Sequence, residues 1–370
     1  MRWTSFGSIL LALTAATPAV AQLPDRAAVV ARIDSLAESF LATTHTPGIS
    51  LAVLQASDTL VMKGYGFADN DTRRRATSST VYRIGSITKQ FTSSAIMRLV
   101  EHGRLSLEDD VSKYLPEVPL HGQRVTVREL LNHTSGIHSY TSKKEWVAHW
   151  ADDLTPRQIV AFVDNDTLDF MPGTRFLYNN TGYVLLGMLI EKVTGESYAR
   201  YLQHDLLTPL SLAQTSYCPS HVTDTTFAAG YATDSNGVKP PQYVSMTQPF
   251  AAGALCSTVR DVVRWQRSLA GGRVVNASSY RLMTTSDTVA SGKPTGYGFG
   301  LATGTLETKP WIGHTGSIHG FTAATLYLPE DGVDVVVLSN ADAGPNPLAL
   351  NIARTVLGLP LAKPKPFKSF

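Results

Sequence analysis

The strongest constraint on this fold is the position of its strand-like runs, which lie near the two ends of the chain. Two strands are predicted in residues 49–69, around a short turn. Four more are predicted at residues 296–303, 310–316, 320–330 and 333–341. Asp331-Gly332 is a strong hairpin signal between the last two runs. Because tight turns join antiparallel neighbours, the sequence predicts an antiparallel sheet and argues against a doubly wound one.

The rest of the chain has helical character. Apolar residues recur at helical spacing in residues 25–41 and 347–359, and the middle of the chain is mostly helices and loops. We therefore predict an α+β fold, an antiparallel sheet flanked by N- and C-terminal helices, with a mostly helical inserted domain on its other face. The predicted boundaries are 22–85 and 291–360 for the discontinuous sheet domain, 86–290 for the helical domain and 361–370 for a tail. A site is expected in the cleft between the two domains.

Residues 1–21 have the features of a cleaved export signal. Arg2 precedes a short apolar run, and Ala19-Val20-Ala21 supplies a small-x-small cleavage site. The run is too short to span a bilayer, and no later segment resembles a membrane span. The mature protein is therefore predicted to be periplasmic or secreted. A formal net charge of +2, with both signs interspersed, gives no footprint for nucleic acid.

The cysteine and histidine patterns bear on cross-links and metals. In an oxidising compartment Cys218 and Cys256 could form a disulfide, but two buried free thiols are the alternative, and spacing does not decide between them. The ten histidines form no zinc-binding pattern, so no metal site is expected.

The stretch RIGSITKQ at residues 83–90 holds the first candidate for catalysis. Ser86 lies three residues before Lys89, where a strand-like segment gives way to a helix. At this spacing both side chains share one helix face, so Lys89 can hydrogen-bond Ser86 and activate it as a nucleophile. The helix start also favours negative charge that develops nearby. An exposed first-turn lysine is the alternative.

The stretch LYNNTGY, which leads into an apolar helix, holds the second candidate. A lysine cation near Tyr178 would favour the phenolate, so that Tyr178 could act as a general base. Asn180 carries both a donor and an acceptor, and it could hold Lys89 and a substrate carbonyl group. Simple packing at the domain seam is the alternative for Tyr178.

The third candidate is GHTGSIHG, residues 313–320, on a predicted strand. His314 and Thr315 are predicted to bind a substrate carboxylate or the tyrosine oxygen, and Gly316 to let the substrate backbone approach closely. The backbone N–H of Ser317, with that of the nucleophile, is predicted to form an oxyanion hole. A strand histidine with purely structural partners is the alternative for His314.

Ser-x-x-Lys, Tyr-x-Asn and His-Thr-Gly, in that order, resemble the three motifs of penicillin-recognising serine enzymes. More specifically, the chain is similar to the class C β-lactamase-related family, which includes D-alanyl-D-alanine carboxypeptidases and serine esterases. The resemblance extends from about residue 25 to 340. It implies the β-lactamase and penicillin-binding-protein fold, an acyl-enzyme on Ser86, proton transfer shared by Lys89 and Tyr178, and Asn180 as an orienting residue. No metal or organic cofactor is implied.

Two positions depart from this resemblance. His314 stands where class C β-lactamases carry lysine, which favours the carboxypeptidase and esterase branches, and its charge is expected to depend on pH near neutrality. Asn179 stands where serine is common, and it is interpreted as a tolerated variant. His133 and His319 are interpreted as structural.

The leading hypothesis is an exported serine hydrolase that acts on a D-alanyl peptide, a β-lactam, or a small ester or amide. The alternative is a non-catalytic peptidoglycan- or peptide-binding module of the same fold. The sequence does not decide which substrate is used, which of Lys89 and Tyr178 is the base, or the oligomeric state.

Overall fold

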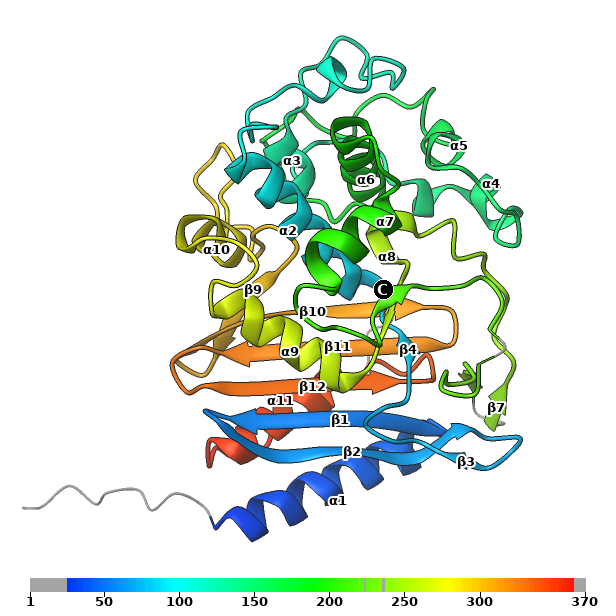
Figure 1. Cartoon of the computed structure of the whole chain (residues 1–370), viewed down its shortest axis with the longest axis vertical. Coiled ribbons are helices and arrows are strands. Elements are labelled where there is room, and N and C mark those ends of the chain that lie inside the picture. The colour runs from blue at the N-terminus through cyan, green and yellow to red at the C-terminus, as the bar shows by residue number, and fades with distance from the viewer. Residues whose placement is uncertain (1–24, 223, 235–236, 363–370) are drawn as a thin grey trace, which may run out of the picture.

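The main sheet is antiparallel and is built from both ends of the chain (Figure 1). The computed structural model describes residues 25–222, 224–234 and 237–362, so the predicted export signal and most of the predicted tail lie outside the described residues. The strands, in spatial order, are β3 (Arg74–Arg75), β2 (Asp58–Asp69), β1 (Gly48–Gln55), β12 (Val333–Ser339), β11 (Phe321–Leu328), β10 (Lys309–Ile318) and β9 (Ala302–Leu306). Pairing of β1 with β12 joins the two ends, with Leu51 opposite Val337. The predicted antiparallel sheet is confirmed.

Both faces of the sheet are covered. The first helix, α1 (Arg26–Thr44), and the last, α11 (Asn346–Val356), pack together on one face, where Ile33 and Ile352 are fully buried. Helix α9 (Val259–Ala270) contacts β1 and β12 from the helical part of the chain (Figure 1). Strand β12 lies at the centre and is buried along its whole length, as its near-continuous apolar sequence predicts.

The segment between β3 and β9 is mainly helical. Its helices are α2 (Thr88–Glu101), α3 (Val127–Leu131), α4 (Lys144–Val147), α5 (Pro156–Ala161), α6 (Asn180–Thr194), α7 (Tyr198–Leu202), α8 (Phe250–Gly253), α9 and α10 (Ala277–Thr284), with short turns η1 (Gly85–Ile87), η2 (Val111–Lys113), η3 (Tyr140–Ser142) and η4 (Gln203–Leu207). Two small sheets are formed by β4 (Tyr82–Arg83), β8 (Leu255–Ser257) and β5 (Ser216–Tyr217), and by β6 (Ala232–Asp234) and β7 (Gly237–Lys239). Helix α6 is the apolar helix expected from the sequence, and left-handed Gly195 caps its end.

The strand predicted at residues 296–303 was wrong for most of its length. Gly296 and Gly300 adopt left-handed φ angles of 71° and 73°, so the chain turns here, and β9 begins only at Ala302. A Cβ at Gly300 would lie 2.6 Å from the carbonyl oxygen of Lys89. The glycines therefore serve a close approach to α2, which a strand pattern in sequence does not reveal.

Cys218 and Cys256 form a disulfide, with their Cα atoms 5.1 Å apart. The bridge joins the segment after β5 to β8 and lies in a small buried cluster with Val81 and Met246. The sequence did not decide between a disulfide and two free thiols. The pairing of β5 with β8 brings the two cysteines together, and they form the disulfide.

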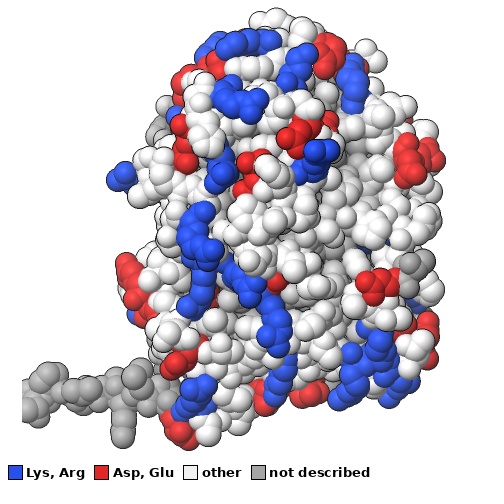
Figure 2. All heavy atoms as spheres, in the orientation of Figure 1, with Lys and Arg blue, Asp and Glu red and all other residues white. Residues whose placement is uncertain are grey.

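Basic side chains gather in a column over α9 on the face shown in Figure 2. Arg260 and Arg264 are exposed on this helix, and Arg273 is exposed just beyond it. In the sequence these arginines are spread over residues 260–273, so they form no contiguous basic run. None of the helices in the described ranges is long and apolar enough to cross a membrane.

Asp334 on β12 is a buried acidic residue in the core of the sheet. Its side chain is fully buried, Oδ2 lies 2.7 Å from Arg267 Nε, and Oδ1 has no hydrogen-bond partner among the described residues. Burial raises the pKa of Asp334 to about 6, although Arg267 acts in the opposite direction. The folded state therefore holds this proton more tightly than the unfolded state.

We expect the contribution of Asp334 to the free energy of unfolding to fall as pH rises from about 4 to 6. The fall should be roughly 2–3 kcal/mol, the equivalent of about two pKa units. Urea unfolding of wild type and Asp334→Asn at pH 4.5 and 7 measures it, because the variant lacks the titration. A stability difference between the two proteins that is independent of pH would contradict a raised pKa.

Candidate active site

Ser86 lies on a tight turn that connects β4 to α2. Gly85 has a left-handed φ of 51°, and a Cβ there would lie 2.7 Å from the backbone nitrogen of Ser317. From the other side, a Cβ at Gly316 would lie 2.0 Å from the carbonyl oxygen of Ile84. Two glycines thus let the Ser86 turn pack directly on β10.

Lys89 is fully buried one turn into α2, below the nucleophile. Its Nζ lies 3.2 Å from Ser86 Oγ, and it donates hydrogen bonds of 2.8 Å to Asn180 Oδ1 and to the carbonyl oxygen of Ala252. Burial holds the pKa of Lys89 well below its usual value. The lowered pKa favours the neutral amine, whose two N–H groups and one lone pair would be shared among these three neighbours.

Tyr178 lies beside this lysine. Lys89 Nζ is 4.8 Å from the centre of the Tyr178 ring. Desolvation raises the pKa of the Tyr178 hydroxyl above its usual value, although the residue is 37% exposed, and hydrogen bonding to Ser86 acts in the opposite direction. This differs from the expectation that a lysine cation would favour the phenolate, because desolvation outweighs the effects that lower the pKa of Tyr178.

Asn180 contacts Lys89, as the sequence predicted. It is the first residue of α6, its Oδ1 accepts from Lys89, and its Nδ2 donates to Thr141 Oγ1 at 3.2 Å. The same side chain faces the pocket described below.

His314 is buried on β10 with both ring nitrogens engaged. Nδ1 lies 2.5 Å from the carbonyl oxygen of Thr315, and Nε2 lies 2.8 Å from the Tyr297 hydroxyl. Since a carbonyl only accepts, Nδ1 carries the proton and Tyr297 donates to Nε2. Burial lowers the pKa of His314 to about 3, so the ring is neutral near pH 7 and its charge does not vary there as expected.

No ring nitrogen of His314 is therefore free for a substrate carboxylate or for Tyr178, whose ring centre is 5.9 Å away. Thr315 is exposed next to it on the strand. The space that a Gly316 side chain would occupy is filled by the backbone of Ile84, and not by substrate as the sequence reading expected. Ser317 is exposed, and its backbone nitrogen lies against the Ser86 turn.

Asn179 has a larger part than the sequence interpretation gave it, and His133, interpreted as structural, packs beside it. Asn179 is no idle variant: its Oδ1 caps α6 by accepting from the Gly182 N–H at 2.7 Å, and its own N–H donates to His133 Nδ1 at 3.1 Å. The ring of His133 is buried 4.4 Å from that of Tyr178. Asn before an apolar helix is a capping signal that was available in the sequence. The His133 contact had no such signal.

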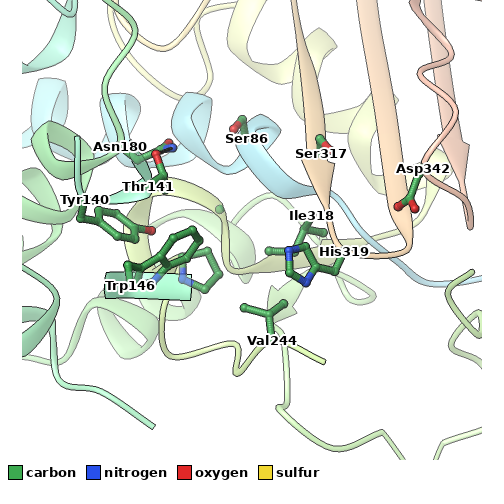
Figure 3. Close-up of a pocket in the computed structure, with 13 residues that line it drawn as sticks. Ser86, Tyr140, Thr141, Trp146, Asn180, Val244, Ser317, Ile318, His319 and Asp342 are labelled. Atoms are coloured by element: carbon green, nitrogen blue, oxygen red, sulfur yellow. Dashed lines mark hydrogen bonds between the residues drawn. The ribbon is translucent and has the colours of Figure 1, made fainter. Parts of the chain in front are cut away.

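A pocket of about 220 Å³ opens beside the nucleophile. Figure 3 shows Ser86 and Asn180 along its upper side, Ser317 on β10, and Trp146, Val244 and His319 below. Of the predicted site residues, Ser86, Asn180 and Ser317 line this pocket. Lys89 lies behind its wall, and Ala252, the lysine's other acceptor, lines it.

The chain is similar to known proteins over most of its length. Residues 33–358 match the sequence profile of the Beta-lactamase family. The chain belongs to this family. Protein flp of Staphylococcus aureus (strain MRSA252) is 29% identical over 323 residues, which are 84% of this chain and 63% of that protein. The chain thus spans less than two thirds of the length of this family relative.

Two solved structures of the family's fold are similar over most of the chain. The octameric penicillin-binding protein homologue from Pyrococcus abyssi is 33% identical with a TM-score of 0.79, covering 89% of this chain and 78% of its own. The D-stereospecific amidohydrolase from Streptomyces sp. is 30% identical with a TM-score of 0.74, covering 90% and 98%. The penicillin-binding-protein-like fold is confirmed. Within the described ranges, no group of three or more His, Cys, Asp or Glu side chains is placed to hold a metal ion.

Proposed function

We propose that this chain is an exported serine hydrolase that cleaves D-amino-acid amides, peptides or small esters through an acyl-enzyme on Ser86. The observation that carries the proposal is the environment of Lys89 Nζ. A neutral amine has two N–H groups, and Asn180 Oδ1 and the Ala252 carbonyl, both acceptors, use them at 2.8 Å. The third neighbour is Ser86 Oγ at 3.2 Å, so the lone pair of a neutral Lys89 amine would face this hydroxyl and take its proton.

The reaction follows from this direction of the hydrogen bond. Ser86 Oγ bonds to the substrate carbonyl carbon as its proton moves to Lys89 Nζ. The carbonyl oxygen becomes an oxyanion. The backbone N–H groups of Ser86 and Ser317 would form the oxyanion hole that stabilises it. When the intermediate collapses, the bond to the leaving group breaks and the leaving group takes the proton that Lys89 had received. A water molecule then gives a proton to Lys89 and attacks the acyl carbon, and the bond to Ser86 Oγ breaks as the serine regains its proton from Lys89.

Tyr178 acts in this scheme as a neutral phenol. Its raised pKa keeps the proton on the hydroxyl, and the hydroxyl lies beside Ser86. It therefore serves to relay a proton between the nucleophile and the leaving group, while Lys89 is the base. A pure peptide-binding module gains nothing from a buried neutral lysine, since burial of an amine without its hydration is costly.

Support for the substrate class comes from the relatives. One similar structure is named a D-stereospecific amidohydrolase and another a penicillin-binding protein homologue. Trp146 and Val244 give the pocket an apolar side that suits a hydrophobic acyl group. Export to the periplasm or medium, predicted from residues 1–21, is part of the same proposal.

The acyl-enzyme is tested by intact mass after an acid quench. With p-nitrophenyl acetate we expect a burst of p-nitrophenol and one acetyl group per wild-type chain, since acylation by an activated ester outruns deacylation. D-alanine p-nitroanilide should turn over faster than its L-enantiomer, and benzylpenicillin serves as a third acyl donor.

Two serine variants are the controls. Ser86→Ala should show neither burst nor adduct, whereas Ser317→Ala should keep both, because Ser317 is proposed to act through its backbone N–H. If Ser86→Ala still formed an adduct, another residue would be the nucleophile. Binding of a D-alanyl peptide that is equal in wild type and Ser86→Ala, with no turnover by either, would favour the binding-module alternative.

A further inference from the structure

A second pocket, of about 380 Å³, adjoins the one at Ser86. The two pockets share His319, which forms the wall between them. We call the second one the Arg83 pocket; it is lined by Arg83, Ser220, His221, Gln242, Tyr243 and Phe321, among others. Arg83 is on β4, three residues before the nucleophile, so the two pockets are fixed relative to each other by one short segment.

Arg83 is unusual among the partly buried arginines. Arg74, Arg98 and Arg267 each donate to a backbone carbonyl or a carboxylate. The Arg83 guanidinium has no hydrogen bond and no ion pair within the described residues; it lies 5.8 Å from the centre of the Phe321 ring and near Tyr243. Burial lowers the pKa of Arg83, and no carboxylate compensates for it. Arg83 is only partly buried and lines the pocket, so its guanidinium is available to a partner outside the chain.

The surroundings of Arg83 suit an anion that carries an apolar stem. Tyr243 and His221 stack with ring centres 5.6 Å apart, and Phe321 adds a further aromatic surface. His319 is held in place, with Nδ1 2.9 Å from the Gln242 carbonyl oxygen. The one carboxylate that lines either pocket, Asp342, belongs to the Ser86 side and accepts from the Gly320 N–H.

We propose that the Arg83 pocket is a subsite for a carboxylate of the substrate, located beyond His319 from the bond that is cleaved. The planar guanidinium matches a carboxylate in a two-point hydrogen bond. The proposal rests on the proposed hydrolase function, because it assigns the far end of the molecule whose carbonyl group Ser86 attacks. It implies that preferred substrates are dicarboxylic or acidic acyl compounds of a defined length.

A length series of activated esters tests this. The probes are mono-p-nitrophenyl esters of succinate, adipate, suberate and sebacate, each compared with a methyl-terminated ester of equal chain length. We expect kcat/KM to favour the carboxylate member by about 10-fold or more at one optimal length. Arg83→Gln should abolish that preference and leave the methyl-terminated esters unchanged. Arg273→Gln, an exposed arginine outside both pockets, is the matched control.

The outcomes separate this subsite from the hydrolase itself. Hydrolysis that depends on Ser86 but shows no carboxylate preference at any length would overturn the subsite and leave the proposed function standing. An equal loss on both ester types in Arg83→Gln would also overturn it, since Arg83 would then only support the Ser86 turn. If wild type hydrolyses none of the esters, both proposals fail.

Discussion

Replacing Lys89 by methionine is expected to lower kcat for p-nitrophenyl acetate by about 10³-fold in a protein that still folds. Methionine fills a similar volume, so the change removes the amine and little packing. The magnitude follows from the loss of a positioned base next to the hydroxyl. Lys113→Met, an exposed lysine on η2, is the matched control and should be as active as wild type.

The double variant makes this prediction specific. Ser86→Ala should lose at least as much activity as Lys89→Met, and Ser86→Ala/Lys89→Met should be no slower than Ser86→Ala alone. The reason is that the amine has no proton to accept once the hydroxyl is gone. If the two losses multiply, Lys89 acts on something other than Ser86.

The pH profile follows from the same assignment. The active form of Lys89 is the neutral amine, so kcat/KM of wild type should decline as pH falls through the lowered pKa of Lys89. His314, with a pKa of about 3, stays neutral near pH 7, so its titration should not add a further rise or fall to the pH profile of kcat/KM.

Gly316→Ala is expected to lower kcat by about 10²-fold or more, the second large effect. The new methyl group would lie 2.0 Å from the Ile84 carbonyl oxygen, which belongs to backbone and has no rotamer to move. Strand β10 must therefore shift away from the Ser86 turn, and a displacement near 1 Å is enough for a loss of this size. We also expect a destabilisation of roughly 1–3 kcal/mol from overpacking.

Thermal unfolding measured beside kcat separates the two effects of Gly316→Ala. Gly344→Ala is the matched control, because no heavy atom lies within 4 Å of a Cβ built there. If Gly316→Ala had the same kcat as wild type, the close contact between β10 and the Ser86 turn would not be what positions the oxyanion hole.

The strand pattern was sufficient to predict the sheet because consecutive tight turns leave antiparallel pairing as the simple solution. It failed at residues 296–303, where glycines at alternating positions resemble a strand but serve a turn against α2. The motif positions were also predictable, since Ser86 and Lys89 share a helix face whatever surrounds them. The disulfide was not, because pairing of Cys218 with Cys256 depends on β5 lying beside β8.

The sequence by itself therefore determined the family, the sheet and the identity of the candidate nucleophile. Only the tertiary structure decided the surroundings of the ionisable groups in the site. Whether Lys89 is a cation or a neutral base depends on how completely α6 and α8 exclude water from it, and on where the Asn180 and Ala252 acceptors lie. The same holds for Arg83, which has no hydrogen bond and no ion pair with any residue that the structure describes. Protonation and pairing reflect the surroundings in three dimensions, and residues distant in sequence supply those surroundings.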